Sequence, residues 1–156
     1  MDTTDNRTSS MKIHRAADAD IPRVAPLFDA YRSFYGQPAD IARADAFLRE
    51  RFANGESALL LAERDGEVLG FTHLYPLFSS VRTARVWLLN DLFVVDGARR
   101  QGVARALLDA AAAFAREQDG AGLMLETTRD NGPARALYRA AGWNEDATQW
   151  YSLHLG

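Results

Sequence analysis

Apolar residues in the first third of the chain recur three and four positions apart, the spacing of one helix face. The members of this stripe are Ile21, Val24, Phe28, Tyr31 and Tyr35. The pattern predicts a helix over residues 21–35 with a proline in its first turn, and a Gly-Gln-Pro break at 36–38. A second helix is predicted over residues 40–53, and a short strand before both helices at 11–15.

Alternating and continuous apolar runs dominate the middle of the chain. Residues 58–63 and 68–77 flank Arg-Asp-Gly-Glu at 64–67, and Asp-Gly suits the type I′ turn of a β-hairpin. Residues 85–95 are apolar on both faces along much of their length, which is typical of a strand covered on both sides. We therefore expect three consecutive strands.

An Ala-rich amphipathic helix is predicted next, with its apolar stripe running from Val103 to Phe114. A strand at 122–128, a short helix at 133–141, and one or two strands at 143–155 complete the chain. The order β-α-α-β-β-β-α-β-α-β, with a further strand as an option, predicts an α/β fold: a mixed sheet with helices on both faces.

Composition and charge narrow the class of protein. The 156 residues suffice for one domain, expected at 11–156 after a disordered tail at 1–10. The sequence contains no Cys, so a disulfide, a thiolate zinc site and a thiol nucleophile are excluded. The three His are isolated in sequence without ligand spacing, and we expect no metal.

The formal net charge of −3 disfavours a nucleic-acid partner, which normally requires a basic excess. Neither a long apolar run nor a charged-then-apolar leader is visible, so we expect a cytoplasmic protein without a membrane partner.

A turn that contains Gly102 connects the predicted strand at 85–95 to the predicted amphipathic helix. The first amides of a helix have no partner inside the helix, and the helix dipole favours an anion there. Gly102 leaves those amides accessible, and Arg99, Arg100 and Arg105 add positive charge. The segment fits a pyrophosphate site, and it also fits a tight turn with solvated arginines.

Arg-x-x-Gly-x-Ala at 99–104, after Asn-Asp-Leu-Phe-Val at 90–94, resembles the acetyl-CoA signature of the GCN5-related N-acetyltransferase (GNAT) superfamily. Residues 131–143, with Asn at a helix start, Leu-Tyr and a closing Gly-aromatic pair, resemble its second signature. The resemblance covers nearly the whole chain after residue 10. It implies a mostly antiparallel mixed sheet with splayed central strands, and the acetylation of an amine by acetyl-CoA.

The resemblance also implies cofactor-binding positions, between the strand ending at Val94 and the strand ending at Thr128. These are Leu92, Phe93 and Val94 for the pantetheine arm, Arg99, Arg100, Gln101, Gly102, Val103, Ala104 and Arg105 for the pyrophosphate, and Asn131 beside the pantetheine. The backbone N–H of Phe93 or Val94 is expected to meet the oxyanion. Asn131 also fits an ordinary helix N-cap.

Catalytic roles follow from the same resemblance. Tyr138 matches the family's general acid toward the leaving thiolate, although it also fits a packed core aromatic. The acceptor amine, with a pKa of about 10.4, must lose a proton at neutral pH. Asp91 and Glu126 are the nearest acids, and each also fits a structural hydrogen bond.

The acceptor side resembles the diamine and thialysine acetyltransferases, which have an acidic pair where this chain has Asn90 and Asp91. Loss of one acid disfavours a polyamine. Residues 31–36 resemble small histone-type and amino-acid acetyltransferases. Tyr31, Tyr35 and Tyr75 fit the walls of an acceptor cleft, and they also fit an amphipathic core.

Taken together, the sequence predicts an N-acetyltransferase that moves the acetyl group directly to a primary amine of a small molecule, of the diamine, thialysine or amino-acid type. A protein or peptide amine is the alternative within the same class. A non-catalytic, regulatory CoA-binding domain is the alternative outside it. The apolar run at 150–155 fits a homodimer formed through C-terminal strands.

Overall fold

A computed structural model describes residues 9–156, so residues 1–8 of the predicted tail lie outside the described part of the chain. The chain forms two compact units that divide after Glu126. The first unit holds the whole sheet and helices α1, α2 and α3, and the second, Thr127–Gly156, holds helix α4.

A five-stranded sheet in the order β1-β2-β3-β4-β5 forms the centre of the first unit. Neighbouring strands are antiparallel except β4 and β5, which are parallel. The strands are β1 (Lys12–Arg15), β2 (Ala58–Arg64), β3 (Glu67–Ser79), β4 (Ala84–Val94) and β5 (Leu123–Met124). The predicted mixed, mostly antiparallel sheet is confirmed.

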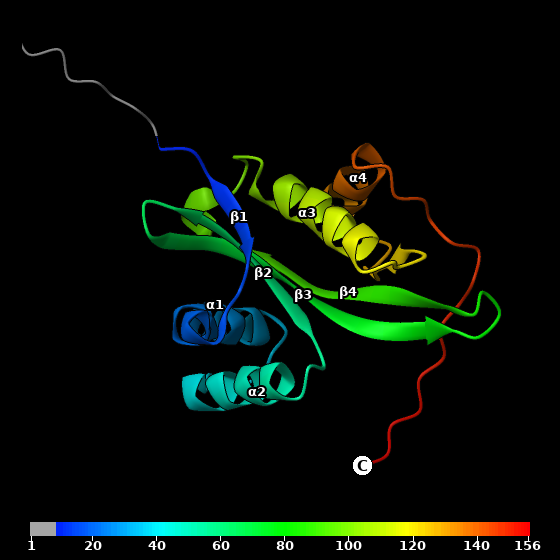
Figure 1. The fold of residues 1–156 in the computed structure, drawn as a ribbon, viewed down its shortest axis with the longest axis horizontal. Helices are drawn as coiled ribbons and strands as arrows, with labels where there is room; N and C mark the ends of the chain where they lie inside the picture. Colours follow the sequence, from blue (N-terminus) through cyan, green and yellow to red (C-terminus); the bar gives the residue numbers. More distant parts are fainter. Residues whose placement is uncertain (1–8) are drawn as a thin grey trace, which may run out of the picture. The chain divides into compact units, whose positions relative to one another are not determined.

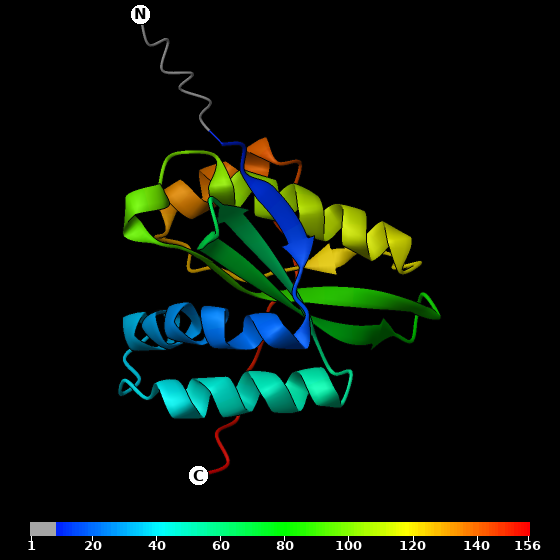
Figure 2. The same ribbon diagram turned by 60° about the vertical axis from the view of Figure 1, so that its left-hand side comes forward.

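Three helices cover the two faces of this sheet (Figures 1 and 2). Helices α1 (Ile21–Phe34) and α2 (Ile41–Ala53) lie on one face, and α3 (Val103–Glu117) lies on the other. The cap of α2 is local, because the Asp40 side chain accepts a hydrogen bond from the Arg43 amide at 3.0 Å. The predicted arrangement of helices on both faces is confirmed.

The β2–β3 hairpin has the turn that its sequence predicts. Asp65 and Gly66 both have positive φ, 52° and 80°, the combination that a type I′ turn requires. Arg64 pairs with Glu67 directly across this turn. Turn chemistry thus sets the register of the pairs next to the turn, and an extra residue, Leu69, shifts the register beyond Glu63.

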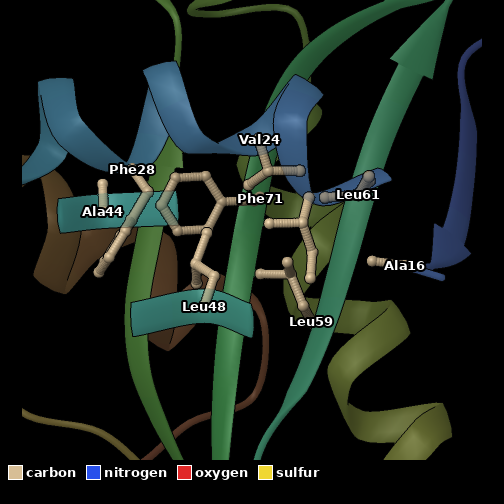
Figure 3. Close-up of a cluster of buried hydrophobic side chains, with 9 residues drawn as sticks. Ala16, Val24, Phe28, Ala44, Leu48, Leu59, Leu61 and Phe71 are labelled. Atoms are coloured by element: carbon tan, nitrogen blue, oxygen red, sulfur yellow. The ribbon is translucent and has the colours of Figure 1, made fainter. Parts of the chain in front are cut away.

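The apolar face of α1 packs on the sheet and on α2 (Figure 3). Phe28 lies between them, with its ring 6.2 Å from that of Phe71 on β3 and 5.8 Å from that of Phe47 on α2. The buried members of this cluster are Ala16, Ile21, Val24, Phe28, Ala44, Leu48, Leu59, Leu61 and Phe71. Burial of these side chains anchors α1 above β3 and β4.

Two strand predictions for the C-terminal third are wrong. Strand β5 is only Leu123–Met124, not 122–128, and residues 143–155 form no strand. An alternating pattern indicates which side of a strand would be buried, but a strand forms only where a neighbour completes its hydrogen bonds. The apolar side chains of the expected final strand, Trp150 and Leu153 among them, are exposed.

Candidate functional site

A β-bulge in β4 changes which face of the sheet the following side chains occupy. His73 on β3 pairs with Asp91, whereas the next residue, Leu74, pairs with Leu89, so Asn90 is the extra residue. Successive side chains of a strand alternate between faces, and one inserted residue inverts that alternation. Asp91 therefore shares the face of His73.

Ring contacts on either side of the bulge show the two faces. Before the bulge, Trp87 packs on Phe114 of α3, with ring centroids 4.9 Å apart. After the bulge, Phe93 packs on Tyr31 of α1, at 6.3 Å. Regular alternation would place Phe93 on the same face as Trp87. The extra residue thus directs Asp91 towards α1.

Asp91 and His73 form a buried pair on this face. They are 4% and 1% exposed, and His73 Nδ1 lies 3.1 Å from Asp91 Oδ2. The other carboxylate oxygen, Oδ1, accepts a hydrogen bond from Asn90 Nδ2 at 2.9 Å. A buried carboxylate needs such donors, so Asp91 makes the structural hydrogen bonds that the sequence left open as an alternative.

Two tyrosines adjoin this pair. The Tyr31 hydroxyl donates to the Asn90 carbonyl at 3.4 Å, and the Tyr75 ring lies 4.7 Å from the His73 ring. Burial, and then the negative charge of Asp91, raise the pKa of Tyr31 well above its ordinary value. The same two causes raise the pKa of Tyr75 to about 12, against a smaller lowering by Arg51. Both phenols therefore remain protonated hydrogen-bond donors at neutral pH.

The structure thus brings Asn90, Asp91, Tyr31 and Tyr75 together, as the acceptor-site prediction requires. Tyr35 is 65% exposed, at the rim, with its ring 5.0 Å from that of Tyr31. Sequence reasoning missed His73, which looked isolated. The hairpin register of β3 and β4 is the signal that places it opposite Asp91, and that register depends on the bulge.

One edge of β4 is mostly unpaired. Strand β5 pairs only with Trp87 and Leu88, so within residues 9–156 the rest of this edge, from Leu89 to Val94, has no ladder partner. The predicted splay after the paired segment is present on the β4 side, where these backbone groups have no strand partner and the Val94 carbonyl accepts a hydrogen bond from Arg99 Nε at 3.2 Å.

Alternation identifies which backbone groups face this open edge. The Val95 amide donates to the Leu69 carbonyl on β3 at 2.9 Å. The backbone N–H and C=O groups of successive residues in a strand point to opposite sides. The backbone groups of Leu92 and Val94 therefore face the open edge, and those of Phe93 face β3. Of the two amides expected to meet an oxyanion, the Val94 amide is therefore the one on the open side.

The Gly-bearing turn leads into the N-terminus of α3 as predicted. Gly102 has φ +80° and Arg100 has φ +61°, and no side chain caps the helix. The helix ladder begins with the Ala106 amide donating to the Gly102 carbonyl at 3.0 Å. The amides of Val103 and Ala104 consequently point out of the helix end, where an anion is favoured.

Charged side chains around this turn have local partners. Arg99 lies 3.2 Å from Asp96, and Arg105 lies 3.2 Å from Asp109. Gln101 joins the turn to β2 through hydrogen bonds of its side-chain amide. The backbone amides of Val103 and Ala104 are therefore the donors of this turn that lack a partner inside the helix.

The remaining predicted site residues lie further along the chain. Glu126 is exposed, just past the end of β5. In the second unit, the Asn131 side chain accepts from the Ala134 amide at 3.3 Å and so caps α4 (Gly132–Ala140). Tyr138 on α4 has its ring 6.4 Å from that of Trp143. The roles of Asn131 and Tyr138 toward acetyl-CoA stay predictions.

Two further features are absent from the described residues. Across residues 9–156, His, Cys, Asp and Glu form no group of three or more arranged to hold a metal ion. None of the helices in that part of the chain is long and apolar enough to span a membrane.

The sequence and the fold are both similar to those of known acetyltransferases. Residues 24–143 match the acetyltransferase (GNAT) family. The chain is 47% identical over 136 residues to the uncharacterized N-acetyltransferase YhfO of Bacillus subtilis (strain 168), covering 87% of this chain and 91% of that protein. It is 34% identical over 103 residues to aminoglycoside N(6')-acetyltransferase type 1 of Klebsiella aerogenes, covering 65% and 68%.

A crystal structure of a probable acetyltransferase is similar over nearly the full length. It is 38% identical, with a TM-score of 0.88, and the match covers 93% of this chain and 98% of that one. The chain belongs to the GNAT family of acetyltransferases. It is accordingly an acyltransferase, as the sequence predicts, and proteins of this family use acetyl-CoA.

Proposed function

We propose that this protein transfers the acetyl group of acetyl-CoA directly to a primary amine of a small molecule. The observation that carries the proposal is the bulged segment of β4. Its backbone faces an open sheet edge, and Asp91 beside the bulge lies on the α1 face between aromatic neighbours. One short segment therefore offers both an acyl-donor edge and an amine site.

The residues around β4 fit acetyl-CoA. Backbone groups of Leu92 and Val94 at the open edge would hold the pantetheine arm, and the amides of Val103 and Ala104 would hold the pyrophosphate. No atom lies within 4 Å of the position that a Cβ of Gly102 would take, which leaves room at the turn. When bound, acetyl-CoA supplies a thioester-activated acetyl group.

The surroundings of Asp91 support an amine acceptor. Its negative charge is the second cause of the raised pKa of both Tyr31 and Tyr75, so its field reaches both phenols. The same field attracts an ammonium group, and aromatic rings stabilise a cation further. Asn90 in place of a second acid favours an acceptor with one nearby amine over a polyamine.

Two observations support direct transfer to a small molecule. The sequence contains no Cys, which excludes an acetyl-cysteine intermediate and leaves attack by the amine itself. Asp91 is almost fully buried, so only a slender amine reaches it. The similarity to a protein named an aminoglycoside acetyltransferase adds weight to a small-molecule acceptor.

Free-thiol release from acetyl-CoA by the purified protein, measured across a panel of amines, tests the proposal. The panel holds diamines, lysine and thialysine, amino acids, aminoglycosides and basic peptides. We expect release with one class of small amine and little with peptides. Thiol release with peptides alone would contradict the proposal. Binding of CoA without thiol release for any amine of the panel would also contradict it.

A matched pair of variants tests the site itself. Asp91→Asn removes the buried charge and should lower kcat/KM by about 100-fold or more, the usual scale for a group that supports proton transfer. Asp45→Asn removes a carboxylate from the exposed pair with Arg49 on α2, where surface ion pairs contribute little, and should leave kcat/KM unchanged. An equal loss of kcat/KM in the two variants would show that the buried charge of Asp91 has no special role in the reaction.

A further inference from the structure

His73 carries a buried nitrogen that nothing in the described chain satisfies. The Nε2 atom is buried, and no group within residues 9–156 forms a hydrogen bond with it. The whole side chain is only 1% exposed. Leaving a buried polar atom unpaired is unfavourable, so an unpaired atom beside a proposed amine site points to a group that arrives with the substrate.

Hydrogen bonding to Asp91 assigns the state of the His73 ring. An ionised carboxylate only accepts hydrogen bonds, and the Asp91 oxygens face His73 Nδ1 at 3.1 Å and Asn90 Nδ2 at 2.9 Å. His73 Nδ1 therefore carries the hydrogen, and in the neutral imidazole Nε2 holds a lone pair. The unpaired atom is a proton acceptor.

We propose that His73 accepts the proton of the substrate ammonium at Nε2, directly or through one water, while Asp91 holds the imidazole at Nδ1. This inference rests on the proposed function and deepens it. It assigns the general base to His73 and makes Asp91 a positioning residue.

The proton balance is complete without another co-reactant. The substrate ammonium gives one proton to Nε2 and becomes a neutral amine. The imidazolium formed keeps its Nδ1 proton, which stays hydrogen-bonded to the Asp91 carboxylate. The amine forms a C–N bond to the acetyl carbon as the C–S bond breaks. The amide nitrogen sheds its second proton, the leaving thiolate takes up one proton, and His73 returns its proton to solvent.

Titratable groups face His73 from three of the elements around it. Asp91 on β4 places its carboxylate 3.1 Å from His73 Nδ1, and Tyr75 on β3 and Tyr31 on α1 remain neutral because their pKa values are raised. Helix α2 contributes the charge of Arg51, which acts on Tyr75. Phe28 of α1, with its ring 6.3 Å from that of His73, is apolar.

Two amide replacements of His73 each keep a polar group near one of its two ring nitrogens. His73→Asn keeps a donor near the Nδ1 position and removes Nε2. His73→Gln places an amide near Nε2 and removes the Nδ1 donor. Neither amide is a base, so both variants should lose about 100-fold or more in kcat/KM at pH 7. His73→Asn should retain the CoA affinity of the wild type.

The pH profile is the readout that a structural role would not change. As pH approaches the pKa of the substrate amine, the substrate deprotonates in solution and no longer needs a base. The loss in His73→Asn should therefore shrink steadily between pH 7 and about pH 10. A loss that stays constant with pH, or one below about fivefold at pH 7, would overturn the inference.

His14→Asn is the matched control, because His14 also pairs with a carboxylate, Glu63 Oε2 at 2.9 Å, but is 40% exposed on β1. It should keep the wild-type kcat/KM and pH profile. Amine-dependent thiol release by the wild type is established first. No release with any amine overturns the proposed function and this inference together, whereas an active wild type with an unaltered His73→Asn overturns the inference alone.

A spectroscopic test covers the case in which the variants fail to fold. Long-range ¹H–¹⁵N NMR of the wild-type protein distinguishes the two imidazole tautomers. We expect His73 to carry its hydrogen on Nδ1 at neutral pH. Finding the hydrogen on Nε2 would remove the lone pair on which the inference depends and would overturn it.

Discussion

The Tyr31 hydroxyl donates a hydrogen bond to the Asn90 carbonyl at 3.4 Å, and this contact joins α1 to the bulge in β4. The same tyrosine packs its ring against Phe93 just beyond the bulge. Helix α1 therefore does more than cover the core. It contacts the strand segment whose facing decides where Asp91 lies.

Tyr31→Phe should weaken activity more than stability. The lost hydrogen bond is long, so we expect a cost below about 1 kcal/mol in the free energy of unfolding, while kcat/KM should fall about threefold to tenfold if the contact orients the bulge. Urea unfolding and thiol-release kinetics measure the two effects. Tyr151→Phe is the control, since Tyr151 is 90% exposed, and a similar loss there would argue against a role for the Asn90 contact.

Gly102→Ala should weaken CoA binding. At φ +80°, an alanine costs on the order of 1–2 kcal/mol, and relief of that strain would turn the amides before α3 away from the pyrophosphate. Isothermal titration calorimetry with CoA should show Kd raised about fivefold to thirtyfold, the same energy expressed as affinity. Gly97→Ala, in the same turn region with open space for a Cβ and no positive φ, should bind CoA as the wild type does.

Gly70→Ala should destabilise the sheet beneath the site. A Cβ at Gly70 would lie 2.6 Å from the Phe93 carbonyl oxygen and 3.3 Å from Val94 Cα, and backbone atoms in a paired strand yield little. We expect a loss of about 1–3 kcal/mol, the usual cost of overpacking, measured by urea unfolding. At Gly122 a Cβ would meet only the end of the Arg82 side chain, at 3.3 Å, so a matching loss in Gly122→Ala would contradict this explanation.

The His14–Glu63 pair should make stability depend on pH. The hydrogen bond to Glu63 raises the pKa of His14, while Arg23, followed by His14, lowers the pKa of Glu63. A raised histidine pKa stabilises the fold below about pH 6.5, and this contribution disappears as pH rises through the folded-state pKa. The contribution of Glu63 has the opposite sense and is lost as pH falls through its own lowered pKa.

Urea unfolding of wild type and His14→Asn at pH 5.5 and pH 8 measures the effect of the pair. The wild type should exceed the variant in free energy of unfolding by more at pH 5.5 than at pH 8. Parallel behaviour of the two proteins at both pH values would show that the pair contributes nothing.

Local chemistry made much of this fold predictable. Asp65 and Gly66 adopt positive φ without help from distant residues, so the hairpin follows from its turn. The apolar stripe that includes Val24 and Phe28 identifies the buried face of α1. Gly102 marks the start of α3 because the chain takes a positive φ of 80° there, which glycine adopts without strain. Each of these depends on residues within a few positions of one another.

Strand partners were less predictable. The alternation at 143–155 is real in the sequence, yet these residues form no strand, and β5 is shorter than its apolar run. Whether a segment pairs depends on hydrogen-bonding neighbours that are distant in sequence. The hydrophobic pattern of a segment does not identify these neighbours.

By itself, the sequence determined the order of helices and strands from β1 to α4, the Gly-bearing turn before α3, and Asn90, Asp91 and the three tyrosines as candidate acceptor-site residues. Only the tertiary structure decided that Asp91 faces α1 and meets His73. One extra residue at the bulge inverts every side chain after it. The pairing of β3 with β4, summed over many backbone hydrogen bonds and buried rings, selects the position of that residue, so no local pattern reveals which face Asp91 occupies or that it meets His73.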